Sequence, residues 1–505
     1  MDIAVRLSKE SGWEPCYWIS DPFMKDLVKE KFPGIIFHSN FDAVRGIRSA
    51  DCSHLKISAL DQSILKEYAY GELITLQMMN RMDSIDCFSY GERVRLYHTL
   101  LRYWSAVLEQ FKPDAVLFVE SPHLIYDYIL FMLCKKKGIK TIMFDRTSLE
   151  GLIFSMESFE DGSKAIKSLY EQVLTEKKVG SPLKVTLSES SEKYLKRISG
   201  EYSKDLPFYH FSHRFRPELK GLVKRKLLEV IRNPRLVLVW AKVPNIYEKR
   251  MGKKIEEPSI MTRWEFIRCR YRGRRKKKRL LRYYEHLVQD VDYTRPYIYV
   301  PMHYQPERST SPMGEVFANQ FLMIDLLSKT VPEGWQIYIK ESPRQFSTLR
   351  SNGERARTKD FYDDVVLLPN VRFISLSCTS FDLIDHSKAV ATVTGTSGWE
   401  ALCRGKPALI FGHPWYRYCE GVFYTPTKEA CRDAVSKIAD GYTVDKESVR
   451  LFVSVVERVC ARGFFNPLPM FAQASGVSYE DNVVSLTKAI QTFVRETWPG
   501  STLKK

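Results

Sequence analysis

A short run of small and hydroxyl-bearing residues is the feature of this sequence best suited to chemistry. It spans residues 394–398, after the β-branched run 389–393 and before a helix predicted to begin at Trp399. Small side chains let a phosphate approach the backbone, and the free N–H groups at a helix start favour that anion. A tight strand-to-helix connection with N-terminal caps fits the same pattern. Because the run lacks the spacing of a P-loop or of G-x-G-x-x-G, it predicts only a phosphate cradle.

Two further segments place polar side chains after predicted strands. Lys340 ends the apolar run 336–340 and could neutralise a phosphate, although a lysine at a strand end is more often solvent-exposed. The loop 301–314 follows the apolar run 296–301 and is rich in functional groups, so it either binds a ligand or caps the next helix. We favour binding. The candidate binding residues of this loop are His303, Gln305, Glu307 and Arg308.

The N-terminal part of the chain also has polar residues after its predicted strands. Runs 115–119 and 140–144 are predicted strands, and residues 124–136 between them are a predicted helix closed by Gly138. Ligands of such β-α-β units bind beyond the carboxyl ends of the strands. The residues at this potential site edge are Glu120, His123, Asp145 and Arg146.

The alternation of short apolar runs with helical patterns predicts an α/β protein with two parallel-sheet domains. Residues 3–7 and 34–37 are further candidate strands, and the last helical pattern covers residues 479–497. We predict four parts of the chain: an N-terminal Rossmann-like domain (1–200), a basic, largely helical insertion (201–292), a C-terminal Rossmann-like domain (293–475) and a C-terminal helix packing back across the domain junction (476–505).

The positive charge of the protein is concentrated in one segment. The 505 residues carry 77 Lys and Arg against 60 Asp and Glu, a net charge of +17. Residues 204–282 contain 25 of these basic and 7 of these acidic residues, so the rest of the chain is nearly neutral. A packed core is not stabilised by such a concentration of positive charge. The segment 204–282 is therefore predicted to be a separate functional element.

This basic segment contains two cationic stretches. Apolar residues recur at helical spacing over 219–231 with basic residues between them, and a dense run of charge covers 272–279. Binding to anionic lipid head groups, which we favour, competes with nucleic-acid binding and with a merely solvated surface. We expect no nucleic-acid partner, because no nucleic-acid-binding motif accompanies the charge. The predicted membrane-binding residues are Lys224, Arg225, Lys226, Arg274, Arg275, Lys276, Lys277, Lys278 and Arg279.

Length and composition exclude several classes of protein. With 44% hydrophobic and 27% charged residues, the chain is neither disordered nor fibrous and is long enough for more than one domain. Its ten cysteines are scattered without a C-x-x-C pair, so neither a disulfide framework nor a metal site is predicted. No apolar run is long enough to span a bilayer and no signal-peptide pattern begins the sequence, so we expect a cytoplasmic protein.

Three motifs in the second half of the chain together resemble one family. They lie at residues 299–308, at 340–343 (Lys-Glu-Ser-Pro) and at 392–407, which includes the small-residue run. In order and spacing they are similar to those of the capsular polysaccharide biosynthesis proteins, bacterial glycosyltransferases of the GT-B type related to Kdo transferases. The resemblance covers residues 296–424, is weaker over 113–144 and is absent from the basic segment.

The resemblance implies two Rossmann-like domains facing a cleft, with the nucleotide sugar held mainly by the C-terminal domain and the acceptor by the N-terminal one. It implies no metal and no cofactor besides the nucleotide sugar as co-substrate. Lys340 would line the phosphate pocket and Glu400 would lie near the nucleotide. Glu120 and His123 occupy the family's acidic strand-end motif, which makes Glu120 our candidate general base. The implied donor-binding residues of the small-residue run are Thr394, Gly395, Thr396, Ser397 and Gly398.

One position departs from the family pattern. Relatives have Lys-Glu-His-Pro where this chain has Ser342, which we treat as a third catalytic position. A histidine there would stabilise or protonate the departing phosphate, a role that His303 or His413 could take over in this chain.

These observations predict a glycosyltransferase of surface polysaccharide synthesis, cytoplasmic and peripheral at the inner membrane. The expected donor is a CMP-activated acidic sugar such as Kdo, and the expected acceptor is a glycan or a lipid-linked molecule. One alternative is an enzyme like the UDP-sugar epimerases or the CDP-polyol phosphotransferases on the same frame. The other is a non-catalytic, membrane-recruited assembly protein, which Ser342 favours.

Overall fold

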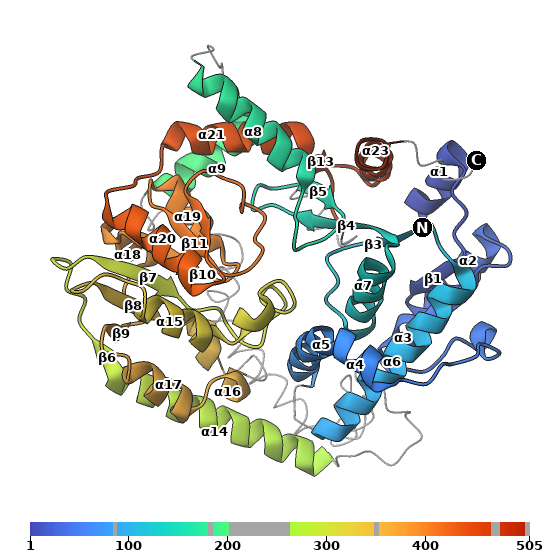
Figure 1. Cartoon of the computed structure of the whole chain (residues 1–505), viewed down its shortest axis with the longest axis horizontal. Coiled ribbons are helices and arrows are strands. Elements are labelled where there is room, and N and C mark those ends of the chain that lie inside the picture. The colour runs from blue at the N-terminus through green and yellow to red at the C-terminus, as the bar shows by residue number, and fades with distance from the viewer. Residues whose placement is uncertain (84–87, 180–184, 201–262, 348–352, 466–474, 500–505) are drawn as a thin grey trace, which may run out of the picture.

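Two α/β lobes make up the computed structural model of the chain (Figure 1). The structure describes residues 1–83, 88–179, 185–200, 263–347, 353–465 and 475–499. The predicted α/β class, with two Rossmann-like domains in a GT-B-like arrangement, is confirmed. The four predicted domain boundaries remain predictions.

A seven-stranded parallel sheet forms the centre of the C-terminal lobe, in the order β12-β11-β10-β7-β8-β9-β6. Its register joins Tyr299 of the central strand to Tyr338 on one side and to Val390 on the other. These strands are apolar runs because helices cover both faces of the sheet. The strands are β6 (Val288–Gln289), β7 (Tyr297–Pro301), β8 (Gln336–Lys340), β9 (Val371–Ile374), β10 (Ala389–Thr392), β11 (Ala408–Ile410) and β12 (Val422–Tyr424).

Helices pack on the two faces of this sheet with separate apolar clusters. One cluster joins the sheet to α14 (Arg263–Leu287), α15 (Gln320–Ser328), α17 (Lys359–Val366) and α20 (Lys428–Ala439). The other joins it to α18 (Ser380–His386) and α19 (Thr396–Cys403). The remaining helices here are η3 (Glu315–Ala318), η4 (Pro343–Phe346), α16 (Gly353–Ala356) and α21 (Lys446–Val459).

The N-terminal lobe contains two smaller sheets. A parallel pair is formed by β1 (Tyr17–Ser20) and β2 (Ile36–Ser39). A mixed sheet has the order β13-β5-β4-β3, in which β3 and β4 are parallel and the other pairs antiparallel. Its strands are β3 (Ala115–Phe118), β4 (Lys140–Arg146), β5 (Leu152–Met156) and β13 (Ala461–Arg462).

The predicted β-α-β unit is confirmed in this lobe. Helix α7 (Ile125–Lys137) connects the parallel strands β3 and β4 and ends at Gly138, whose φ of 69° is a left-handed conformation that suits glycine. The other helices of the lobe are α1 (Asp2–Ser11), η1 (Pro22–Met24), α2 (Lys25–Lys31), α3 (Asn40–Val44), η2 (Ala50–Cys52), α4 (Gln62–Glu67), α5 (Ala69–Met82), α6 (Tyr90–Phe111), α8 (Lys164–Lys178) and α9 (Glu189–Ser199).

The strand predicted at residues 3–7 is wrong, because this segment lies inside α1. Ile3 and Leu7 are four residues apart and therefore share one face of a helix. That face packs on α23 (Tyr479–Thr497), where Leu7 belongs to the same apolar cluster as Leu486 and Ile490. A short apolar run does not distinguish a strand from a helix by itself.

The end of the chain returns to the N-terminal lobe. Strand β13 pairs with β5, and α23 packs on α1, β5 and β13. Helix α21 packs on α8, and α9 packs on α19, so that the two lobes share one apolar core (Figure 1). This packing between the lobes places the carboxyl ends of β3 and β4 near the loops that follow the strands of the C-terminal lobe.

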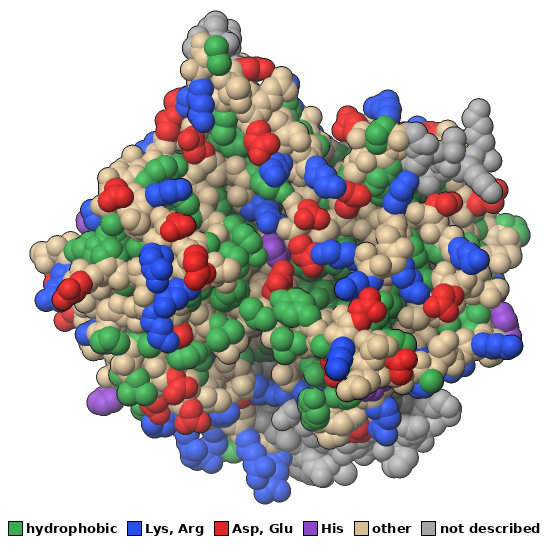
Figure 2. Space-filling view, in the orientation of Figure 1, with side chains coloured by type: hydrophobic (Ala, Val, Ile, Leu, Met, Phe, Trp, Pro, Cys, Tyr) green, Lys and Arg blue, Asp and Glu red, His purple; other side chains and the backbone are tan. Residues whose placement is uncertain are grey.

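Helix α14 runs along the outer edge of the C-terminal lobe (Figure 1), and basic side chains gather along that edge in Figure 2. Leu280 and Tyr284 are buried against the lobe. Lys277 lies on the same helix face and is only 2% exposed. Its ammonium donates to the Ser347 carbonyl at 3.1 Å and pairs with Glu354 at 3.3 Å.

The predicted membrane-binding role of Lys277 is therefore wrong, because helical periodicity turns this one charge of the run toward the protein. The other charges predicted on α14 are exposed: Arg274, Arg275, Lys276, Lys278 and Arg279. Residues 224–226, predicted to share this role, lie outside the described residues. No helix in the described ranges has both the length and the hydropathy of a membrane-spanning segment.

Candidate functional site

The small-residue run lies at the carboxyl end of β10 and opens α19. The helix begins at Thr396, three residues earlier than predicted, so Ser397 and Gly398 belong to its first turn. Gly395 is the N-cap residue, with φ −72° and ψ 151°, and no side chain caps this helix. The N–H of Gly398 donates to the Gly395 carbonyl at 3.3 Å, so the N–H groups of Thr396 and Ser397 are the ones at this helix start that the phosphate-cradle interpretation requires.

His303 supports this turn from the loop after β7. Its Nε2 lies 3.0 Å from Thr392 Oγ1 and accepts the backbone N–H of Thr394 at 3.3 Å. Its Nδ1 lies 2.7 Å from Glu307 Oε1. Because an amide N–H can only donate and a carboxylate can only accept, the ring proton is on Nδ1. His303 and Glu307 thus position the turn.

The same network explains the glycine at position 395. A Cβ there would lie 2.6 Å from Thr392 Oγ1 and 3.2 Å from the His303 ring. Burial is the largest single influence on the pKa of Glu307 and raises it, but His303, Ser309 and Arg344 together outweigh burial, so the pKa is lowered overall. Glu307 therefore remains a carboxylate that holds His303 in place.

Gln305 holds the loop after β7 together. It is 6% exposed. Its N–H donates to Gln345 Oε1 at 2.8 Å, and its amide donates to Thr310 Oγ1 at 2.5 Å. These contacts engage both the backbone and the side chain of Gln305. The residue therefore stabilises the loop after β7.

Lys340 and Ser342 lie after β8, on either side of Glu341. The Lys340 ammonium donates to the Cys378 carbonyl and to Ser380 Oγ at the start of α18. Burial lowers its pKa. We predicted that Lys340 would face the turn 394–398. The described contacts of its ammonium are instead with the start of α18 and the residue before it. Ser342 is half-buried just before η4.

Sequence reasoning missed a buried ion pair beside these residues. Arg357 and Glu341 pair through Nε and Oε1, with side chains 3% and 0% exposed. Tyr362 also donates to Glu341 at 3.2 Å, and Arg357 donates to the His303 carbonyl at 3.3 Å. The pair thus ties the loop after β8 to the residue that supports the turn. Glu341 belongs to the Lys-Glu-Ser-Pro motif, but nothing in the sequence pattern identifies Arg357 as its partner.

Glu120 and Arg308 come together across the two lobes. Glu120 follows β3 of the N-terminal lobe, Arg308 belongs to the loop after β7, and the two form an ion pair. Figure 2 shows acidic and basic side chains next to each other where the lobes meet. The carboxylate predicted as general base is therefore neutralised by a residue predicted to bind the donor.

His123 and Asp145 flank this ion pair. His123 donates from Nδ1 to the Ser121 carbonyl at 3.1 Å. Burial and then the charge of Arg308 lower its pKa to about 4, so the ring is neutral at physiological pH. Asp145 lies near the end of β4, and burial raises its pKa to about 6.

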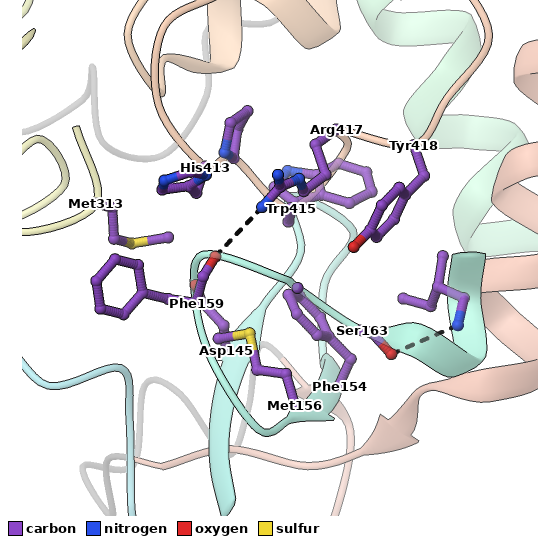
Figure 3. Close-up of a pocket in the computed structure, with 13 residues that line it drawn as sticks. Asp145, Phe154, Met156, Phe159, Ser163, Met313, His413, Trp415, Arg417 and Tyr418 are labelled. Atoms are coloured by element: carbon purple, nitrogen blue, oxygen red, sulfur yellow. Dashed lines mark hydrogen bonds between the residues drawn. The ribbon is translucent and has the colours of Figure 1, made fainter. Parts of the chain in front are cut away.

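A cavity lies between the lobes beside Asp145 (Figure 3). The empty space of about 280 Å³ there includes open solvent. Phe154, Met156 and Phe159 line it from the N-terminal lobe. Residues of the loop after β11 line it from the other side, namely His413, Pro414, Trp415, Arg417 and Tyr418. No sequence pattern identifies this cavity, because its two walls are far apart in the chain.

Glu400 lies on α19, one turn after the start of the helix. Its carboxylate accepts from Thr396 Oγ1 at 3.5 Å. Burial raises its pKa to about 7, against the lowering effects of Thr396 and Arg404. Among the described residues, no group of three or more His, Cys, Asp or Glu side chains is arranged to hold a metal ion.

Comparison with known proteins gives a family match to part of the C-terminal lobe. Residues 310–438 match the family described as capsule polysaccharide biosynthesis protein, a segment that includes β8, β10 and α19. The resemblance predicted from the sequence motifs is confirmed by this match. A search of curated proteins found no match.

Several solved structures are distantly similar. The beta Kdo 2,4 transferase KpsC of Thermosulfurimonas dismutans is 14% identical, with 68% of this chain and 78% of that chain covered and a TM-score of 0.26. Anabaena Alr3699/HepE in complex with UDP-glucose is 15% identical, with 40% and 50% covered and a TM-score of 0.23. The UDP-GlcNAc 2-epimerase from Methanocaldococcus jannaschii is 13% identical, with 74% and 84% covered and a TM-score of 0.24. These similarities are too distant to support an argument about activity.

Proposed function

We propose that this protein is a glycosyltransferase of surface polysaccharide synthesis that uses a nucleotide-activated sugar. The observation that carries the proposal is the uncapped N-terminus of α19, within the segment that matches the capsule polysaccharide family. A helix start after a parallel strand is a site that favours phosphate. The donor is a CMP-activated acidic sugar such as Kdo, and the acceptor is a glycan or a lipid-linked molecule at the inner membrane.

Glycosyl transfer needs a base for the acceptor hydroxyl and a stabiliser for the charge on the leaving phosphate. In this proposal the N–H groups of α19 and the hydroxyls of Thr396 and Ser397 hold the departing phosphate. His303 keeps the turn in place, and Arg308 brings a cation to the border between the lobes. Lys340 contributes to phosphate binding at most through the loop before α18, because its ammonium already donates a hydrogen bond to the Cys378 carbonyl in that loop.

The direct test is turnover by the full chain. Purified protein is incubated with CMP-, UDP-, GDP- and CDP-linked sugars and a panel of alkyl glycosides. Nucleotide release is followed, and the glycoside-dependent product is detected by mass spectrometry. A transfer product supports the proposal, and no transfer with any pair contradicts it.

Replacing Thr396 with aspartate is expected to weaken nucleotide binding about 100-fold. A carboxylate about 5 Å from a phosphate at an effective dielectric near 20 opposes binding by about 3 kcal/mol, which corresponds to that factor. The same aspartate stabilises the helix start by about 0.3–1 kcal/mol, so the fold should persist. Calorimetric titration with the four nucleotides measures the change.

The matched control is Thr396→Asn, which has the shape of aspartate without its charge. Both variants lose the hydroxyl that donates to Glu400, so only the charge separates them. Equal affinities for the two variants would show that the phosphate binds elsewhere.

Ser342→His is expected to raise the transfer rate, and more so at pH 6 than at pH 8. An imidazolium offers a charge-assisted hydrogen bond to the leaving phosphate, roughly twice as strong as that of a neutral hydroxyl. With a reference pKa near 6.5, the ring is mostly charged only at the lower pH. Single-turnover kinetics of both forms make the comparison. A rate that does not rise at either pH would mean that another group already serves the leaving phosphate.

A further inference from the structure

Glu315, the first residue of η3, has an uncommon backbone conformation. Its φ of 47° is left-handed, and in the described part of the chain Lys112 is the only other non-glycine residue with a positive φ. The Cβ of a glutamate is crowded in this conformation. Such strain persists only where the surrounding contacts impose it, and it is concentrated at sites where function requires it. The contacts of Glu315 therefore indicate its role.

The carboxylate of Glu315 bridges the two lobes. Tyr70, on α5 of the N-terminal lobe, donates to its Oε2 at 2.5 Å. His413, in the loop after β11, has its Nε2 2.8 Å from Oε1. The hydrogen bond with His413 and that with Tyr70 lower the pKa of Glu315 although burial opposes them, so the group is ionised at neutral pH. Hydrogen bonds to an ionised acceptor are roughly twice as strong as neutral ones.

This bridge is one of two polar contacts that the loop between β7 and α15 makes with the N-terminal lobe. Through Glu315 the loop reaches α5, which packs on η3. Through Arg308 it reaches Glu120, at the end of β3. His413 also lies beside Phe159 of the N-terminal lobe, with ring centroids 6.0 Å apart (Figure 3). Contacts at separate places restrict the rotation of one lobe against the other more than a single contact does.

The same loop is bonded to the turn at the start of α19. The hydroxyl of Thr394, the first residue of that turn, donates to the Ser309 carbonyl at 2.9 Å. The N–H of His413 donates to the Met313 carbonyl at 3.0 Å. The position of the N-terminal lobe relative to the turn is therefore fixed close to Glu315.

We propose that Glu315 is a positioning residue for the transfer reaction. Through Tyr70 it holds the N-terminal lobe in the orientation in which an acceptor on that lobe reaches a donor phosphate at the turn. This inference rests on the proposed glycosyltransferase function. Transfer needs its two reactants aligned to within about 1 Å, so a residue that never touches them can control the rate. The strained backbone persists because it directs one carboxylate to Tyr70 and His413 together.

The first test is Tyr70→Phe, which removes only the hydroxyl of a half-exposed side chain. With the nucleotide sugar and the alkyl glycoside that give the highest wild-type rate, kcat/KM for the glycoside is expected to fall about 10-fold. The loss of one hydrogen bond to a carboxylate changes an equilibrium between lobe orientations by about this factor. Nucleotide affinity should stay within about twofold of wild type, because the proposed donor site lies in the C-terminal lobe. Tyr90→Phe is the matched control, since Tyr90 is 72% exposed on α6 of the same lobe, and its kcat/KM should be unchanged.

Variants of Glu315 show whether Tyr70 acts through it. Glu315→Ala keeps the Cβ and its crowding, and its transfer should fall at least as far as that of Tyr70→Phe. In the Glu315→Ala background, Tyr70→Phe should have no further effect, because both changes remove the same contact. Glu315→Gly should transfer as slowly as Glu315→Ala but melt at a higher temperature, because glycine adopts a positive φ without crowding.

Each outcome decides between the possibilities. Wild-type protein without transfer activity contradicts the proposed function itself. Active wild type with an unimpaired Tyr70→Phe, or with additive losses in the double variant, overturns this inference and leaves the proposed function intact. Equal losses of nucleotide affinity and of transfer in Tyr70→Phe also overturn it, because the contact would then support only the donor site. If Glu315→Ala does not fold by circular dichroism, Glu315→Gly provides the background for the double variant.

Discussion

Replacing Arg357 with methionine is expected to destabilise the C-terminal lobe by about 3–5 kcal/mol, the usual effect of leaving a buried charge without its partner. Glu341 has 0% of its side chain exposed and Arg357 only 3%. Without the guanidinium, only the Tyr362 hydroxyl remains as a described side-chain donor to Glu341 Oε1. The Phe361 ring also loses the cation that lies 4.5 Å from its centroid.

Urea unfolding followed by circular dichroism measures this loss. The control is the double variant Glu341→Gln/Arg357→Met, which removes both charges and should recover part of the stability. The single variant should also weaken nucleotide binding, since Arg357 donates to the carbonyl of His303. A loss of less than about 1 kcal/mol would mean that the pair is hydrated and contributes little.

Replacing Arg274, Arg275, Lys276 and Lys278 with glutamine is expected to reduce binding to anionic vesicles about 1,000-fold. Each basic residue near such a surface contributes about 1 kcal/mol, so four of them contribute about 4 kcal/mol. All four side chains are exposed, and α14 is anchored to the lobe by Leu280 and Tyr284. Helix α14 therefore holds these four charges on the outside of the lobe.

Co-sedimentation at physiological salt, with vesicles containing phosphatidylglycerol, measures this change. A control with equal charge loss replaces four exposed lysines of the N-terminal lobe, Lys25, Lys31, Lys135 and Lys136. Lys277→Gln alone should leave vesicle binding unchanged, since Lys277 is buried against Glu354. Equal losses in the two quadruple variants would indicate attraction by net charge alone, and tighter binding to nucleic acid than to lipid would contradict the proposal.

Local patterns in the sequence were enough to predict most of the elements. Strands β7, β8 and β10 and helix α23 lie within a residue or so of their predicted positions. Their apolar periods and flanking turn residues are properties of neighbouring positions, which the sequence displays directly. The strand predicted at residues 3–7 failed because the helix there is decided by packing against α23, at the other end of the chain.

The sequence by itself determined which side chains are present at the strand ends: the hydroxyls of the turn 394–398, the carboxylates of Glu120 and Asp145, and the charges of the loop after β7. Only the tertiary structure decided which of them meet. It paired Arg308 with Glu120, bonded Lys340 to the loop before α18 and turned Lys277 inward. The physical reason is that a side chain's partners come from whichever segments pack beside it, and packing joins segments that are distant in the sequence.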